Sequence, residues 1–189
     1  MMNHWPQETG RAEARSSGGS RGRGTRPCAL LLLGLAVCFA VPAAANELPI
    51  IFLVRHAERA AKSGRVPSDT GLSAEGKARA QALAQVLKEA KITTIYTSEY
   101  KRTKDTAAPL AESSGVRSEV IPADDLRSLL AKLKASRGNV LVIGHSNTLP
   151  QIINALGVKS RVTVAESDYD NLFLVILEQP PRLIQLHYR

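Results

Sequence analysis

Cysteine is nearly absent from this chain, and aromatic residues are scarce. The 189 residues include two cysteines, Cys28 and Cys38, and aromatic residues make up 4% of the chain. Both cysteines fall within the first 45 residues, so the rest of the chain has neither a disulfide nor a thiolate site. The remaining residues must therefore be held together by a hydrophobic core alone.

The chain also lacks an apolar run long enough to span a membrane comfortably. Its longest run, residues 29–41, has the length of the apolar segment of an export signal. Residues 42–45 follow with the sequence Pro-Ala-Ala-Ala, which suits cleavage before Asn46. We expect residues 1–45 to be an export signal, cleaved or retained as an anchor, and residues 46–189 to be the folded domain. This predicts a bacterial protein that is periplasmic or extracellular, without stable membrane association after cleavage.

Positive charge is modest in the expected folded domain. The segment before Asn46 holds five Arg and two Glu, which leaves 20 basic and 15 acidic side chains and a net charge of +5. Such a charge suits an anionic substrate. No basic stretch is interleaved with aromatic residues, as binding of single-stranded nucleic acid would require, and we expect no nucleic-acid partner.

Apolar runs and helical stripes alternate from residue 49 onward. We expect strands at residues 50–54, 92–97, 117–121 and 140–143, and helices at about 73–90, 101–113, 126–133 and 149–156. Residues 171–178 and 182–188 flank Gln179-Pro180-Pro181 as a terminal hairpin or a pair of edge strands. Pro109 should kink the second helix or mark an early turn. The pattern predicts a single three-layer α/β/α domain whose sheet is mostly parallel, with a C-terminal edge strand or hairpin.

Two of the expected strands lead into a histidine. The first strand leads into Arg55 and His56, and the fourth leads into His145. Because ligands bind beyond the carboxyl ends of parallel strands, we expect these side chains to share one pocket. Arg102 lies at the start of the helix after the second strand, where the helix dipole and free N–H groups favour anions.

This combination suits the transfer of a phosphoryl group. A neutral imidazole such as that of His56 can attack phosphorus, and the Arg55 guanidinium can donate two parallel hydrogen bonds to phosphate oxygens. Arg102 and His145 add further donors, and Arg59, on the loop over the pocket, is a further candidate substrate contact. The four groups around one site could bind a phosphoryl group and stabilise its transition state without a metal ion or another cofactor.

Four motifs occur in order between residues 50 and 156. They are Leu53-Val54-Arg55-His56-Ala57-Glu58; Leu72-Ser73-Ala74-Glu75-Gly76 with Ala80-Gln81-Ala82; Thr97-Ser98-Glu99-Tyr100-Lys101-Arg102-Thr103 with Thr106-Ala107; and Val142-Ile143-Gly144-His145-Ser146-Asn147. Together they resemble the histidine phosphatase superfamily, also called phosphoglycerate-mutase-like. The resemblance implies a phosphatase whose nucleophile His56 is phosphorylated, whose phosphate pocket contains Arg55, Arg102 and His145, and whose substrate is a small phosphorylated molecule.

The resemblance does not assign the residue that gives a proton to the leaving group. One branch of the superfamily has an acidic residue directly after the second histidine, where this chain has Ser146. The other branch takes a carboxylate from the loop after the third strand, which here contains Asp124 and Asp125. Asp124 is the expected proton donor because it lies nearer the strand end, with Asp125 and Glu58 as alternatives. If none serves, the substrate needs a good leaving group, as in a phosphoramidate or an acid anhydride.

Two other functions fit the same pocket. A phosphoglycerate-mutase-like transferase is less expected, because the chain lacks the long insertions with which such mutases enclose a bisphosphorylated sugar acid. The second is a phosphate-binding protein of the same fold that does not turn over a substrate.

An α/β-hydrolase is an alternative of another class. Ser146 lies in a segment that approaches the nucleophile elbow of those enzymes, and Asp168 or Asp170 and then His187 follow in their chain order. Thr148, however, stands where the elbow has its final glycine. This alternative also leaves the arginine–histidine pair of the first strand without a role.

Overall fold

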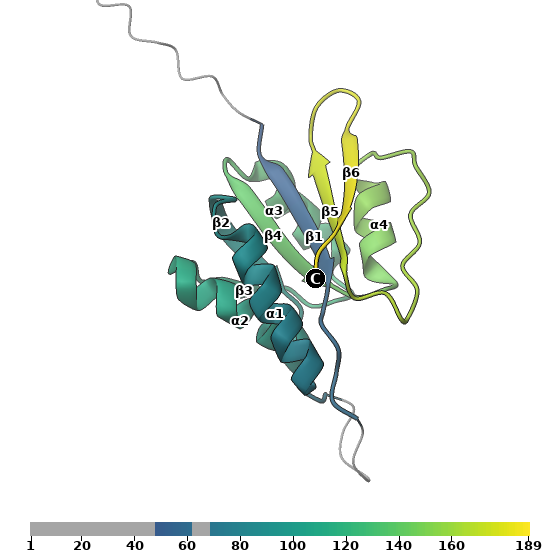
Figure 1. Cartoon of the computed structure of the whole chain (residues 1–189). Helices are drawn as coiled ribbons and strands as arrows, with labels where there is room; N and C mark the ends of the chain where they lie inside the picture. Colours follow the sequence, from purple (N-terminus) through teal and green to yellow (C-terminus); the bar gives the residue numbers. More distant parts are fainter. Residues whose placement is uncertain (1–47, 62–68) are drawn as a thin grey trace, which may run out of the picture. The chain divides into compact units, whose positions relative to one another are not determined.

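The computed structural model describes residues 48–61 and 69–189 (Figure 1). The expected export signal and its cleavage site before Asn46 lie outside these residues, as does part of the loop that follows the first strand. In the described ranges, no helix combines the length and the apolar character needed to cross a membrane.

The strands of the described residues form one six-stranded sheet, in the order β3-β2-β4-β1-β5-β6. The strands are β1 (Ile50–Arg55), β2 (Ile92–Thr97), β3 (Ser118–Val120), β4 (Asn139–Gly144), β5 (Asn171–Ile176) and β6 (Arg182–His187). Strands β1 to β4 run parallel to one another, whereas β5 pairs antiparallel with both β1 and β6. The sheet is therefore mostly parallel, and the expected C-terminal hairpin forms one edge.

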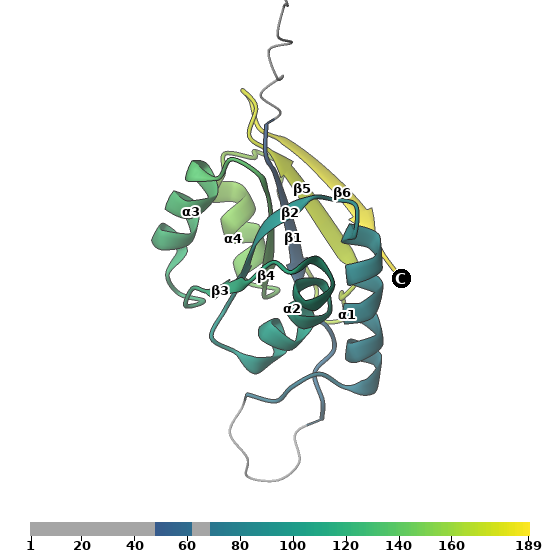
Figure 2. The ribbon, with the colours of Figure 1, turned by 90° about the vertical axis from the view of Figure 1, so that its left-hand side faces the viewer.

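The helices cover both faces of this sheet. They are α1 (Ala74–Leu87), α2 (Lys101–Ser114), α3 (Leu126–Ala135) and α4 (Thr148–Ala155). Helices α1 and α2 pack on one face, and α3 and α4 pack on the other (Figure 2). This arrangement confirms the predicted three-layer α/β/α fold.

Strand β1 lies in the middle of the sheet, which explains its continuous apolar sequence. Ile51 and Leu53 belong to the core under α3 and α4, and Phe52 and Val54 belong to the core under α1 and α2. Each of the four side chains is at most 6% exposed. A strand covered on both faces buries every side chain, so its sequence need not alternate between apolar and polar residues.

Helix α1 begins where the sequence predicts and packs against the segment that follows His56. The Ser73 hydroxyl accepts a hydrogen bond from the Gly76 N–H at 3.1 Å, which caps the helix. The Ser73 N–H donates to the Glu58 carbonyl oxygen at 2.9 Å. A Cβ at position 76 would overlap that same oxygen, so only glycine permits this close approach.

Pro109 does not end helix α2. The helix continues to Ser114 and stops at Gly115, whose φ of 72° is the left-handed conformation common at helix C-termini. Of the two outcomes expected at Pro109, a kink or an early turn, the early turn is wrong. Proline removes one intrahelical hydrogen bond, and Ala107 and Leu110 hold this part of the helix on the sheet by packing.

Parallel pairing of β1 with β4 brings the two histidines together. Arg55 is in register with Gly144, and the His56 N–H donates to the Gly144 carbonyl oxygen at 3.0 Å. His56 and His145 are each the next residue after a strand, so both leave the sheet at the same edge.

Candidate active site

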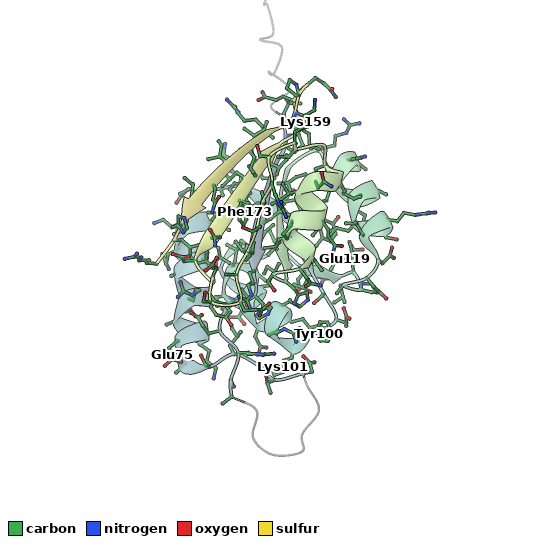
Figure 3. The ribbon with its side chains drawn as sticks, turned by 90° about the vertical axis from the view of Figure 1, so that its right-hand side faces the viewer. Glu75, Tyr100, Lys101, Glu119, Lys159 and Phe173 are labelled. Atoms are coloured by element: carbon green, nitrogen blue, oxygen red, sulfur yellow. The ribbon has the colours of Figure 1, made fainter. Side chains whose placement is uncertain are left out.

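The carboxyl ends of β1, β2 and β4 open into a cleft of about 590 Å³. Its lining includes the four residues predicted to form a phosphate pocket and two further candidates: Arg55, His56, Arg102, His145, Arg59 and Asp124. Figure 3 shows Tyr100, which also lines the cleft, at the end of the domain opposite Lys159. The sequence-predicted residues therefore meet in one place.

His56 is held in the tautomer that a nucleophile requires. Its Nδ1 lies 2.8 Å from the Ala57 carbonyl oxygen, which can only accept, so Nδ1 carries the proton and Nε2 keeps its lone pair. The side chain is buried. Burial, with the nearby positive charges of Arg102 and Arg55, lowers the pKa of His56 to about 4. The ring is therefore neutral at pH 7.

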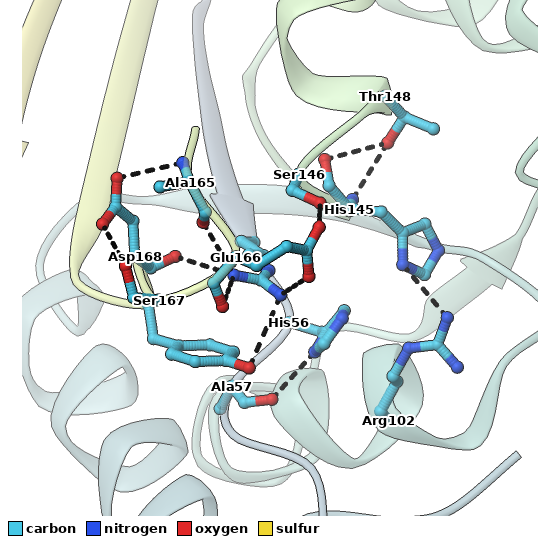
Figure 4. Close-up of polar contacts among 12 residues, drawn as sticks. His56, Ala57, Arg102, His145, Ser146, Thr148, Ala165, Glu166, Ser167 and Asp168 are labelled. Atoms are coloured by element: carbon cyan, nitrogen blue, oxygen red, sulfur yellow. Dashed lines mark hydrogen bonds and ion pairs between the residues drawn. The ribbon is translucent and has the colours of Figure 1, made fainter. Parts of the chain in front are cut away.

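His145 lies beside His56 in the opposite tautomer. Its Nδ1 lies 3.4 Å from Nη2 of Arg102, which can only donate, so His145 accepts there (Figure 4). Nε2 then carries the proton and donates to the Ser98 hydroxyl at 3.0 Å. Burial and the Arg102 charge lower the pKa of His145 to about 4. The two imidazole rings lie edge to face with centroids 5.3 Å apart.

Arg102 lies in the first turn of α2, and its guanidinium stacks 4.2 Å over the centre of the Tyr100 ring. Its Nη1 is 3.9 Å from Oδ1 of Asp69, and its buried Nε has no partner among the described residues. The Thr106 hydroxyl joins this turn to β1, because it accepts from the Ala57 N–H at 3.0 Å and donates to the Arg102 carbonyl at 2.7 Å. The arginine is thus fixed next to His56.

Arg55 is enclosed by the loop that precedes β5. Its Nη1 donates to the carbonyl oxygens of Ala165 at 2.9 Å and Glu166 at 2.7 Å, with Asp168 at 3.4 Å. Its Nη2 donates to the Glu166 carboxylate at 2.8 Å, and the guanidinium lies 4.2 Å over the Tyr169 ring. Only 3% of Arg55 is exposed, so these contacts, rather than solvent, fix its position.

Glu166, which lines the cleft, and Tyr169, which packs on Arg55, are residues that the sequence does not predict. The segment 157–170 has no apolar period and no recognisable motif. It reaches Arg55 because β5 pairs antiparallel with β1, with Leu172 opposite Val54. Figure 4 shows Glu166 beside Ser146; its carboxylate accepts from the Ser146 hydroxyl as well as from Arg55.

The three candidate proton donors occupy different positions. Asp124 is exposed and lines the cleft. The Asp125 carboxylate accepts from the Ser128 N–H at 3.0 Å and caps α3. The two carboxylate oxygens of Glu58 share the Nε–H of Arg79, at 2.8 and 2.9 Å, and Oε1 also lies 2.7 Å from its Nη2. Among the three, Asp124 is the carboxylate that faces the cleft without a hydrogen-bond partner in the described ranges.

The residues of the hydrolase alternative do not assemble into a triad. The Ser146 hydroxyl donates to Glu166, and Asp168 accepts from the Ala165 N–H at 3.0 Å. His187 lies at the end of the edge strand β6, with Nδ1 3.3 Å from Asp170. In the part of the chain that the structure describes, no hydrogen bond links His187 to Ser146.

Within residues 48–61 and 69–189, no group of three or more His, Cys, Asp or Glu side chains is arranged to hold a metal ion. The cleft instead gathers guanidinium groups, neutral imidazoles and the first turn of a helix. This set of groups suits a multiply charged anion.

Comparison with known families gives a match to one of them. Residues 51–129, which contain Arg55, His56 and Arg102, match the family model of the histidine phosphatase superfamily (branch 1). A search of the curated proteins found no match to this sequence.

Solved phosphatase structures share the fold. The protein histidine phosphatase SixA, in complex with tungstate, is 19% identical, with a TM-score of 0.61 over 73% of this chain and 96% of its own. A mycobacterial glucosyl-3-phosphoglycerate phosphatase is 17% identical, with a TM-score of 0.57 over 74% and 98%. An Agrobacterium tumefaciens protein described as a candidate phosphohistidine phosphatase SixA is 20% identical, with a TM-score of 0.55 over 74% and 97%. At these identities the likeness establishes the fold.

Proposed function

The chain belongs to the histidine phosphatase superfamily, and from that premise we propose that it hydrolyses a small phosphorylated molecule through a phosphohistidine on His56. One observation carries the proposal. The His56 ring is neutral, its Nδ1–H is bound to the Ala57 carbonyl, and its Nε2 lone pair is left free in a cleft that also contains two arginines.

In the first step, Nε2 of His56 bonds to phosphorus while the bond from phosphorus to the leaving-group oxygen breaks. The imidazole becomes positively charged, and the Ala57 carbonyl stabilises that charge through Nδ1–H. Asp124, in its protonated form, gives its proton to the leaving oxygen. The leaving group then departs as an alcohol.

In the second step, water attacks the phosphorus of the phosphohistidine. Asp124, now a carboxylate, accepts the proton that the water loses, and the bond between nitrogen and phosphorus breaks. Inorganic phosphate and neutral His56 are formed, so both residues return to their starting states. The reaction as written uses protein groups and water alone.

Arg102 and His145 stabilise the charge on the transferring phosphoryl group. The buried Nε of Arg102 is an available donor, and the first turn of α2 adds a favourable dipole. A bound dianion favours the protonated form of His145, so its Nδ1–H can then donate to a phosphate oxygen. Before substrate binds, the same nitrogen accepts from Arg102 and keeps that side chain in position.

The substrate itself is assigned only as a class. The printed names of the structural neighbours include a protein histidine phosphatase and a glucosyl-3-phosphoglycerate phosphatase, so the shared fold serves different leaving groups. The mycobacterial enzyme has also been solved with inorganic phosphate, and SixA with tungstate, both tetrahedral oxyanions. We propose a small phosphorylated molecule, whose phosphoryl group is bound by Arg55, Arg102 and His145.

The test is to trap the intermediate with a ³²P-labelled phosphomonoester, using the full chain. A label that is stable in base, labile in acid and absent from His56→Ala supports phosphohistidine. His187→Ala is the matched control, because this exposed histidine lies outside the cleft, and it should keep the label. Inhibition by a fluorophosphonate that is lost in Ser146→Ala contradicts the proposal and favours the hydrolase. Phosphate binding without turnover across a substrate panel contradicts it in favour of a binding protein.

Export is a separate part of the proposal and depends on residues 1–45. Mass spectrometry of the protein recovered from the periplasm or medium should give an N-terminus at Asn46. An intact product confined to the cytosol contradicts export and would make phosphorylated cytosolic proteins candidate substrates.

A further inference from the structure

Arg55 uses its donors unevenly. Its Nη1 donates to the backbone carbonyl oxygens of Ala165, Glu166 and Asp168. Its Nη2 donates to the Glu166 carboxylate at 2.8 Å and lies 3.5 Å from the Tyr169 hydroxyl. Its Nε is buried and has no partner in the described part of the chain. One donor of the residue expected to bind phosphate therefore has no partner among the described residues.

Nε and Nη2 form one edge of the planar guanidinium. Through this edge an arginine can donate two parallel hydrogen bonds to two oxygens of one anion. Glu166 offers only Oε2 to it, because its other oxygen, Oε1, accepts from the Ser146 hydroxyl. Glu166 thus contacts Nη2, one of the two nitrogens of this edge, and competes there with a phosphoryl group.

The Glu166 carboxylate can also move away from Arg55. Its side chain is 79% exposed, whereas the Arg55 side chain is 4% exposed, so the carboxylate can rotate into water while the arginine stays fixed. The Ser146 hydrogen bond, followed by the Arg55 charge, lowers the pKa of Glu166. The carboxylate is therefore negatively charged at pH 7 and competes with other anions for Arg55.

We propose that Glu166 is an internal competitor for the phosphate site: the substrate phosphoryl group displaces its carboxylate and takes the Nε–Nη2 edge of Arg55. The inference rests on the proposed function, since it takes this cleft as the phosphate site. Its consequence is that Glu166 weakens the binding of substrate and of product phosphate alike. Product release is then faster, and free phosphate in the surroundings inhibits less.

The experiment measures orthophosphate binding and steady-state turnover of a phosphomonoester by the full chain and by Glu166→Gln. The glutamine keeps the shape and one acceptor but removes the charge. Its affinity for orthophosphate should rise by about tenfold, KM should fall, and kcat should not rise because the product leaves more slowly. Glu178→Gln is the matched control. It removes one negative charge from the β5–β6 hairpin, where Glu178 pairs with Arg182, and should bind orthophosphate as the wild type does.

Two results overturn the inference. Equal or weaker orthophosphate binding by Glu166→Gln would mean that the carboxylate holds Arg55 in place for the substrate. A fall in kcat with unchanged orthophosphate affinity would make Glu166 a proton donor instead. If the wild type turns over and binds orthophosphate while Glu166→Gln binds it no tighter, this inference fails alone. If the wild type neither turns over the substrate nor binds orthophosphate, the proposed function itself is wrong.

Discussion

The imidazole rings of His56 and His145 lie edge to face, with their planes at 63°, and are held in opposite tautomers. Nδ1 of His56 donates, whereas Nδ1 of His145 accepts from Arg102. The pair therefore divides two tasks: one ring keeps a free lone pair for attack, and the other orients a guanidinium. Both depend on the rings being neutral, which makes the site sensitive to acid.

Acidification should destabilise the domain between about pH 6.5 and pH 4. The pKa of each buried histidine is about 4 in the folded protein, against 6.5 in an unfolded chain. Between these values the unfolded state binds more protons, so stability falls as the pH falls through this window. The loss should reach up to about 3 kcal/mol for each histidine. Urea unfolding at several pH values measures it.

His56→Gln with His145→Gln supplies the control, because glutamine does not titrate. Its unfolding free energy should change less over the same pH window than that of the wild type. An identical slope in both proteins would assign the acid sensitivity to other groups.

The fold could be predicted because each element has a strong local pattern. Continuous apolar runs predict the buried strands β1 and β4, and Ser73 predicts the start of α1. The meeting of His56 with His145 follows from a general property of parallel sheets, whose strands all end at one edge. No knowledge of the particular side-chain packing is needed for that step.

The contacts that enclose Arg55 could not be predicted in the same way. Glu166 and Tyr169 lie in a loop without a period, and their approach to Arg55 depends on the antiparallel pairing of β5 beside β1. That pairing joins two strands far apart in the sequence, and no local sequence pattern predicts it. Asp125 is an intermediate case: it directly precedes the first leucine of the α3 stripe, so its capping role was open to prediction.

Gly76→Ala should destabilise the domain far more than Gly115→Ala. A Cβ at position 76 would overlap the Glu58 backbone, which cannot move without displacing the segment after His56. We expect a loss of about 3 kcal/mol or more, with reduced activity. At Gly115 the added Cβ meets nothing within 4 Å, and only the left-handed φ of 72° opposes it, so about 1 kcal/mol is expected. Denaturant unfolding of the two variants compares them; similar losses would refute the role of Gly76 in close packing.

Arg102→Lys should lower kcat/KM by about 100-fold, although it preserves the charge. Lysine cannot reproduce both the stacking on Tyr100 and the contact with His145 that fix the guanidinium. Arg59→Ala should raise KM by only about threefold, because this exposed residue lies at the cleft margin. Steady-state kinetics on one phosphomonoester separates them. A lysine variant with near-normal turnover would show that the site needs charge alone at position 102.

Asp124→Asn provides the test of the proton donor, through its dependence on the leaving group. The leaving group of an alkyl phosphate is a strongly basic alkoxide unless an acid protonates it. The kcat of Asp124→Asn on this substrate should therefore fall by about 100-fold or more. The leaving group of p-nitrophenyl phosphate is a weakly basic phenolate, and the kcat of the variant on this substrate should fall by less than about tenfold. The neighbouring variant Asp125→Asn is the control: the asparagine oxygen can still accept from the Ser128 N–H and cap α3, so the variant should keep its stability and both activities. Equal losses on the two substrates in Asp124→Asn would remove Asp124 from proton transfer and leave it a substrate contact.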